Sequence, residues 1–170
     1  MNASFDPLHL VNTYGAFGSV SRERYEVVFS GTDAPWPRPD ARWLEYEFPC
    51  KPGDVQRAPC WITPYHERLD WQMWFAGLSD VRREPWTVHL AYHLLVGDAE
   101  TLSLLSHNPF AAAPPKYVRA ILYRYWFTSF GEPGWWHREP VRDYLPPVSL
   151  DDPRLLGFLE TYGWLDQPQL

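Results

Sequence analysis

The sequence lacks the features that mark membrane-spanning proteins, secreted precursors and nucleic-acid-binding proteins. No stretch of its 170 residues approaches the roughly 18 to 20 consecutive apolar residues that cross a bilayer. The N-terminus, MNASFDPLHLVN, lacks the basic and apolar regions of a signal peptide. Lysine is limited to Lys51 and Lys116, and the net charge of −6 includes no basic stripe for a nucleic acid. We therefore expect a soluble chain without a nucleic-acid partner.

Cysteine is also scarce. Cys50 and Cys60 are the only two, and they flank the loop KPGDVQRAP. Two thiols cannot form a four-ligand zinc site, and no CxxC motif is present. Two interpretations stay open at this point: a short-loop disulfide in an oxidising compartment, or two reduced and partly buried thiols.

Aromatic residues and proline are abundant. The chain has ten Trp, ten Tyr and nine Phe, together 17% of its residues, and eighteen prolines. Each buried aromatic side chain removes about 150 to 250 Å² from water, so such a chain has ample material for a core. A length of 170 residues fits one domain, which we expect to span residues 1–170.

Alternating apolar residues predict strands at Arg24–Ser30 and Arg42–Phe48, which could pair as a long-looped hairpin. Lys116–Ser129 is the strongest predicted strand, and its two largely apolar faces favour a central position in a sheet. Leu8–Ser21 mixes β-forming residues with glycines that suggest bends. The proline- and glycine-rich stretch from Phe130 to Pro147 is predicted to be irregular.

Helical spacing and end signals predict several helices. Asp70 lies near the start of the first helix, Gly97 ends the second, Asp98 caps the third, and Ser149 opens a capping box for the last. The predicted helices cover residues 69–78, 86–96, 99–107 and about 149–162. We predict an α+β fold, a mainly antiparallel β-sheet with three to four helices packed on it.

The motif YHERLDW offers the clearest catalytic hypothesis. Asp70 could orient His66 as a general base. No GxSxG elbow supplies a nucleophile, so a structural ion pair or helix cap formed by Arg68 and Asp70 is the favoured interpretation. We therefore predict no catalytic residues.

Other chemistries are supported less well. His89 and His93 are four residues apart, at the spacing of metal ligands, but no third ligand follows and HLAYH lacks the glutamate of HExxH, so they are a weak candidate for a metal site. Glu45 and Glu47 share a strand face with Trp43, which a carbohydrate-binding platform could use, although a solvated face paired with arginines is favoured. No glycine-rich phosphate loop occurs, and we predict no cofactor.

Tryptophans in two settings are candidates for binding another molecule. Trp71, Trp74 and Phe75 have helical spacing, which is more often typical of a core. Trp36, Trp135 and Trp136 lie in proline- and glycine-rich stretches, where burial is harder, and exposed aromatic surface marks interaction sites.

Five collinear motifs resemble the C-terminal region of the lipase maturation factor family. They are LVNTYGAFGSVSRERYEVVFSGT (10–32), WLEYEFPCKPGDVQRAPC (43–60), PYHERLDWQMWF (64–75), LLSHNPF (104–110) and PPKYVRAILYRYWF (114–127). After residue 130 the resemblance is looser. The resemblance implies a non-enzymatic domain that binds secreted lipases and assists their folding or assembly. A lipid- or carbohydrate-binding module is the alternative.

Family members are multi-pass membrane proteins, and the resemblance places this region on the lumenal side of the endoplasmic reticulum, or on the periplasmic side in a bacterium. The membrane half is absent from this chain. An oxidising compartment favours a disulfide between Cys50 and Cys60. As a hypothesis, the client-binding surface comprises His66, Arg68, Asp70, Trp71, Trp74, Phe75, Trp36, Trp135 and Trp136.

Overall fold

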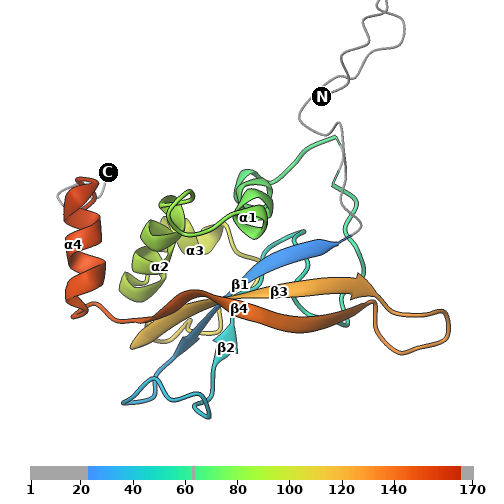
Figure 1. The fold of residues 1–170 in the computed structure, drawn as a ribbon, viewed down its shortest axis with the longest axis horizontal. Coiled ribbons are helices and arrows are strands. Elements are labelled where there is room, and N and C mark those ends of the chain that lie inside the picture. Colours follow the sequence, from blue (N-terminus) through green and yellow to red (C-terminus); the bar gives the residue numbers. More distant parts are fainter. Residues whose placement is uncertain (1–22, 63, 166–170) are drawn as a thin grey trace, which may run out of the picture.

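A four-stranded antiparallel sheet forms the base of the molecule (Figure 1). The computed structural model describes residues 23–62 and 64–165. The sheet order is β2-β1-β3-β4, and all three neighbouring pairs are antiparallel. The strands are β1 (Arg24–Thr32), β2 (Leu44–Glu45), β3 (Tyr117–Phe127) and β4 (Trp136–Val148).

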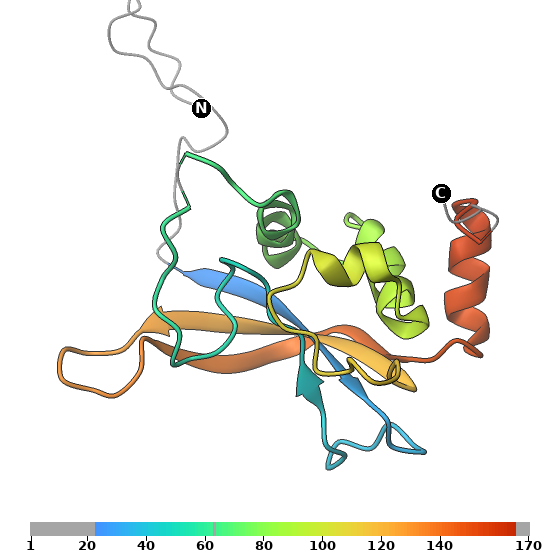
Figure 2. The same ribbon diagram turned by 180° about the vertical axis from the view of Figure 1, so that it is seen from behind.

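The helices lie on one side of this sheet, as the two opposite views in Figures 1 and 2 show. They are α1 (Arg68–Leu78), α2 (Trp86–Val96), α3 (Ala99–Ser103) and α4 (Pro153–Thr161). None of the helices in the described ranges has the length and apolar content to cross a membrane. The structure therefore confirms the predicted α+β fold, with four helices on an antiparallel sheet.

The predicted hairpin and the central strand are confirmed. β1 pairs with β2 through Ser30 opposite Glu45 and Gly31 opposite Leu44, although β2 is shorter than the predicted strand. β3 lies between β1 and β4. The predicted bends at 8–21 lie outside the described residues.

The prediction of an irregular stretch at 130–147 is wrong. Residues from Trp136 onward form β4, which pairs with β3 along most of its length. A strand at the edge of a sheet tolerates proline because its outer N–H groups have no partner strand, and β-bulges absorb the remaining misfit. The register shifts in this pair include one next to Pro140, which lies opposite Tyr123. Pairing with the long strand β3 thus stabilises β4 despite the prolines in its sequence.

Most helix ends follow the expected chemistry. Gly97 ends α2 with φ 71°, and the Asp98 side chain accepts a hydrogen bond from the Thr101 N–H. α3 ends at Ser103, earlier than predicted. The predicted capping role of Ser149 is wrong, because Asp152 is the N-cap of α4 and its carboxylate accepts from the Arg154 N–H. Pro153 follows it and fits the first helical position, which needs no N–H donor.

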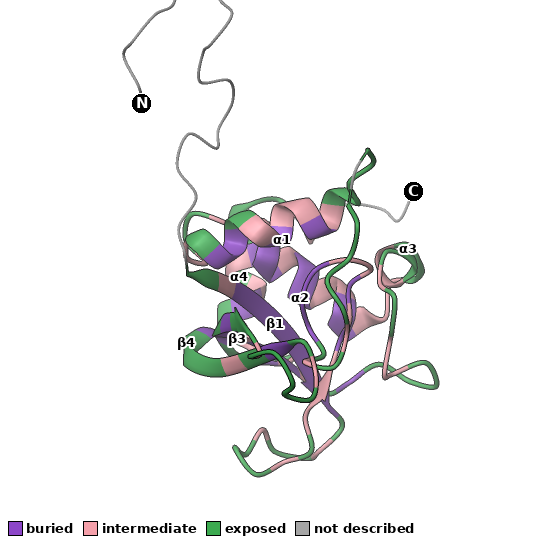
Figure 3. Cartoon of the chain, turned by 90° about the vertical axis from the view of Figure 1, so that its right-hand side faces the viewer, coloured by how far each residue is buried: buried purple, intermediate pink, exposed green. Residues whose placement is uncertain are grey.

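Side chains alternate between the two faces of the inner strands, and this alternation divides the buried residues into a large cluster and a small one. Val27 and Phe29 belong to the large cluster, which the helices complete. Val28, between them in sequence, joins Tyr125 and Trp136 in the small cluster. Figure 3 shows buried segments in α1, α2 and β1, and exposed segments in the loops. The described residues form a single compact body.

Candidate functional site

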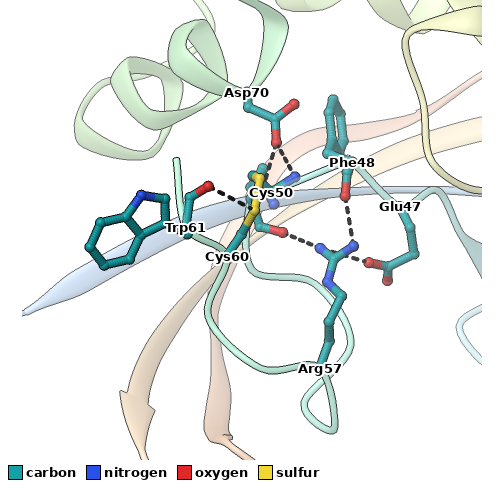
Figure 4. The surroundings of a disulfide bond; sticks show 8 residues. Glu47, Phe48, Cys50, Arg57, Cys60, Trp61 and Asp70 are labelled. Carbon is teal, nitrogen blue, oxygen red and sulfur yellow. Dashed lines mark hydrogen bonds and ion pairs between the residues drawn. A yellow bond between two sulfur atoms is a disulfide. The ribbon is translucent and has the colours of Figure 1, made fainter. Parts of the chain in front are cut away.

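Asp70 ties the start of α1 to the segment that follows β2. Its Oδ1 accepts hydrogen bonds from the Cys50 N–H at 2.7 Å and the Lys51 N–H at 2.6 Å (Figure 4). Asp70 is buried, and its carboxylate lies in the first turn, where negative charge interacts favourably with the helix dipole. One side chain therefore fixes both the helix start and the loop at 50–60.

A disulfide closes that loop. Cys50 and Cys60 are bonded, with their Cα atoms 5.1 Å apart. Inside the loop, the Arg57 guanidinium donates to the carbonyl oxygens of Phe48, at 2.7 Å, and Lys51, and it lies 3.4 Å from the Glu47 carboxylate (Figure 4). We call residues 50–60 the disulfide loop. Its shape is held by a covalent bond and by a charged side chain that binds its backbone.

The disulfide loop also reaches the β3–β4 hairpin. The Val55 carbonyl accepts from the N–H groups of Trp135 at 2.9 Å and Trp136 at 3.1 Å. The Gly53 carbonyl accepts from the Tyr125 hydroxyl at 2.9 Å. These contacts join the small core beneath the sheet to the same loop that Asp70 anchors to α1. The disulfide loop therefore connects the start of α1 to the turn end of the β3–β4 hairpin.

Aromatic side chains gather on α1 and on the segment that leads into it. The rings of Trp71, Trp74 and Phe75 have centroids 5.3 to 5.7 Å apart, and the His66 ring packs edge-on to Trp71 at 4.8 Å. Trp71 and Trp74 are half-buried and Phe75 is exposed. The helix tryptophans thus lie between core and surface.

Sequence reasoning missed the most exposed members of this group. Trp61 and Tyr65 have 87% and 89% of their surface accessible. The available signal was that Trp61 lies between Pro59 and Pro64 and that Tyr65 directly follows Pro64, because a proline-rich connection has few ways to bury a large side chain. We define the α1 aromatic surface as Trp61, Ile62, Tyr65, His66, Trp71, Trp74 and Phe75.

A cavity of about 250 Å³ opens between this surface and the disulfide loop. Its aromatic lining includes His66, Trp71 and Trp74. Charged side chains also line it, and Glu26 and Asp70 among them are almost completely buried. Apolar walls with a few charged groups are typical of binding pockets.

The charged lining contains two cations, Arg24 and Lys51, and two anions, Glu26 and Asp70. Arg24 Nε lies 2.7 Å from Glu26 Oε1, and Lys51 Nζ lies 3.5 Å from Glu26 Oε2. Burial lowers the pKa of Lys51, since desolvation penalises its charged form, while the Glu26 carboxylate acts in the opposite direction. Within the described residues, Glu26 Oε2 and Asp70 Oδ2 are buried and accept no hydrogen bond.

The catalytic and ion-pair hypotheses for YHERLDW gain no geometric support. Asp70 Oδ1 is used by loop amides, and its other oxygen makes no hydrogen bond to His66 in the part of the chain that is described. The expected ion pair between Arg68 and Asp70 is wrong, because Arg68 is exposed while Asp70 faces the loop backbone. The role of Asp70 is structural.

The histidine pair and the strand-face acids have partners of their own. His89 Nε2 and His93 Nε2 lie 3.1 Å apart, and Asp98 lies 3.5 Å from His93 Nδ1. Across residues 23–62 and 64–165, no group of three or more metal-ligating side chains could hold a metal ion. Arg138 binds both carboxylate oxygens of Glu45, at 2.7 and 2.9 Å.

The remaining strand-face and loop tryptophans differ in exposure. The guanidinium of Arg119 covers the Trp43 ring at 4.0 Å, which removes the open aromatic platform that a sugar would need. Trp36 is 65% exposed. It belongs to the β1–β2 loop, which lies at the opposite end of β1 from α1 (Figures 1 and 2). Trp135 is half-exposed, but Trp136 is 6% exposed, so its expected place in an open loop is wrong. Packing under β3 and a 3.0 Å bond from its indole N–H to the Arg57 carbonyl bury it.

Together, the fold and the site define an α+β domain that displays an aromatic surface braced by a disulfide loop. Residues 10–146 match the family "Lipase maturation factor C-terminal domain", and the chain belongs to that family. It is 50% identical over 171 residues to lipase maturation factor 1 of Homo sapiens, covering 96% of this chain and 30% of that protein. It is 40% identical over 174 residues to lipase maturation factor 2 of Xenopus laevis, covering 96% and 24%.

The chain thus spans less than a third of the length of these two relatives. The family is named for a maturation role rather than for a chemical reaction. No solved structure matches the chain.

Proposed function

We propose that this domain binds lipases and assists their folding or assembly, with no reaction of its own. The observation that carries the proposal is the α1 aromatic surface, in which Trp61 and Tyr65 are almost fully exposed and lie in sequence between the disulfide-bonded Cys60 and the start of α1. Exposed aromatic area on a rigid support is typical of protein-binding sites, where tryptophan and tyrosine contribute most of the affinity. The family relationship supports lipases as the class of client.

The disulfide supports an oxidising compartment, as the lumen of the endoplasmic reticulum or a periplasm provides. Secreted lipases pass through the same compartments. We propose that the domain meets its client there. Of the residues predicted from sequence, His66, Trp71, Trp74 and Phe75 belong to the proposed surface, Trp135 is a neighbouring candidate, and Asp70 and Trp136 are internal supports.

The test is capture of a purified secreted lipase by the domain. Replacing Trp61 and Tyr65 with serine should weaken capture by about tenfold or more, because removal of an aromatic anchor at an interface costs about 2 kcal/mol. Trp36→Ser is the matched control, since it removes another exposed tryptophan, in the loop at the opposite end of β1 from α1. These exposed positions should leave the thermal midpoint almost unchanged.

Three outcomes would contradict the proposal in different ways. Failure of the unaltered domain to bind any secreted lipase would overturn the proposed client class. Equal losses for the double variant and Trp36→Ser would show that the α1 aromatic surface is not the binding face. Binding of lipid vesicles or sugars, with lipase capture absent, would favour a ligand-binding module instead.

A further inference from the structure

The cavity beside α1 lies where the chain enters the described fold. Its lining comes from the first residues of β1, which are Arg24 and Glu26, from the start of α1 and from the disulfide loop. The described part of the chain begins at Glu23, one residue before β1. The segment that precedes β1 is therefore joined to the fold at the wall of the cavity.

The charges in the cavity lining are already paired with one another or with the backbone. Arg24 Nε lies 2.7 Å from Glu26 Oε1, and Lys51 Nζ lies 3.5 Å from Glu26 Oε2. Asp70 Oδ1 accepts hydrogen bonds from two backbone amides of the disulfide loop. A charged ligand would lose its hydration here without gaining an unpaired counter-ion, so the lining favours an uncharged occupant.

The other side chains of the lining offer mainly apolar surface. Ile62, Trp71 and Trp74 contribute aliphatic and aromatic area, and the His66 ring lies beside them. The volume of about 250 Å³ lies below the range of about 300 to 1,000 Å³ that is usual for small-molecule sites, and it suits one or two large side chains. An apolar side chain that leaves water for such a cavity is stabilised by the hydrophobic effect.

The segment that precedes β1 has the composition of such an occupant. Residues 8–21 read LHLVNTYGAFGSVS and contain no Asp, Glu, Lys or Arg. At about 3.6 Å per residue, Phe17 and Val20 lie no farther than roughly 25 Å and 14 Å along the chain from Arg24, which lines the cavity. The match to the family domain begins at residue 10, so most of this segment belongs to the domain rather than to a linker before it.

We infer that residues 8–21 of this chain occupy the cavity, with Phe17 and Val20 against its tryptophans. Because the segment is joined to the fold beside the cavity, its effective concentration there is in the millimolar range, and a contact of modest affinity suffices to keep it bound. The inference goes beyond the proposed function. It concerns the cavity and leaves Trp61 and Tyr65, which are absent from the described lining, to the client.

NMR of the unaltered chain gives the first test. We expect nuclear Overhauser contacts from the side chains of Phe17 and Val20 to the indole rings of Trp71 and Trp74. We also expect amides near Phe17 to exchange with solvent at least about tenfold more slowly than in a separate peptide of residues 8–21, because a docked segment opens only transiently. Absence of the contacts would overturn the inference, and so would exchange at the rate of the separate peptide.

A matched pair of variants locates the contact. Phe17→Ser removes the proposed anchor, whereas Phe5→Ser removes a phenylalanine that lies outside residues 8–21. Phe17→Ser should shift the indole N–H signals of Trp71 and Trp74 and abolish the slow exchange, while Phe5→Ser should change neither. Equal effects of the two variants would refute a specific contact. The measurements on the unaltered chain stay decisive if a variant does not fold.

Two further measurements test other occupants of the cavity. Slow exchange that increases with protein concentration would assign the cavity to the same segment of a second copy and overturn docking within one chain. Addition of a purified secreted lipase should leave the slow exchange near Phe17 unchanged. Its loss would show that the client occupies the cavity in the complex, which would also overturn the inference. Lipase capture is measured separately, so its failure would refute the proposed function alone.

Discussion

Replacing Asp70 with alanine should destabilise the domain because two backbone N–H groups would lose their acceptor. Hydrogen bonds to a charged group contribute about 1.5–3 kcal/mol each. The Lys51 amide is buried and would lose the full amount, whereas Cys50 is half-buried and water can replace part of its bond. The substitution also removes Asp70 Oδ2, which is buried without a hydrogen bond, and this offsets part of the lost stability. We expect a net decrease in the free energy of unfolding of about 2–4 kcal/mol.

The decrease is measured by urea denaturation followed by tryptophan fluorescence, with a thermal melt as a second measurement. For a domain near this size, about 1 kcal/mol lowers the thermal midpoint by roughly 2–4 °C, so Asp70→Ala should lower it by roughly 4–16 °C. Asp70→Asn keeps the Oδ1 acceptor and should lose about 1 kcal/mol.

Glu67→Ala is the matched control. It removes an acid at the N-cap of the same helix, but that side chain is exposed and makes no capping hydrogen bond. Its effect should stay within about 0.5 kcal/mol. If Asp70→Ala were as mild as Glu67→Ala, the loop would not depend on the Asp70 carboxylate, and the proposed brace would be wrong.

Gly77→Ala should destabilise the domain by about 1–3 kcal/mol, because a Cβ there would meet the backbone of β1. Gly157→Ala, in an open part of α4, should stabilise it by about 0.5 kcal/mol. The urea denaturation midpoints of the two variants check both predictions. Replacing Cys50 and Cys60 with serine should lower the free energy of unfolding by about 2–3 kcal/mol, and reduction of the disulfide in the unaltered protein should have the same effect. An unchanged urea midpoint would contradict a structural role for the disulfide. Burial raises the pKa of Tyr125 to about 12 from about 10, so its contribution is complete below about pH 10 and is lost as the pH rises through 12. Urea midpoints at pH 9 and 11 should therefore fall more for the unaltered protein than for Tyr125→Phe.

Local sequence signals predicted those parts of the fold in which neighbouring residues decide the structure. The alternation of β1 and β3 gave their positions, and Gly97 and Asp98 marked the boundary between α2 and α3. β4 could not be predicted in this way because its prolines oppose a strand, and only pairing with β3 stabilises it. The cap of α4 was misplaced because two acceptors, Ser149 and Asp152, lie three residues apart and both precede the helix.

The sequence predicted which residue types make up the candidate site, but not how they are arranged in space. The run from Cys60 to Phe75 was identified from the aromatic and charged residues it contains. The buried state of Asp70 and its bonds to the loop depend on contacts about 20 residues apart in sequence, which no local pattern encodes. In the sequence, Glu26 is one of several acids on the strands, and its burial beside α1 follows only from the folded chain.

The disulfide loop explains why a proline-rich connection can support a binding surface. Such connections are usually the most mobile part of a domain. Here the loop is attached to α1 through Asp70, to its own ends through the disulfide, and to the hairpin through Val55. Residues that follow Cys60 therefore start from a fixed point, and their ordering loses less entropy when a partner binds. Asp70→Ala should therefore weaken lipase capture even under conditions in which the variant remains folded.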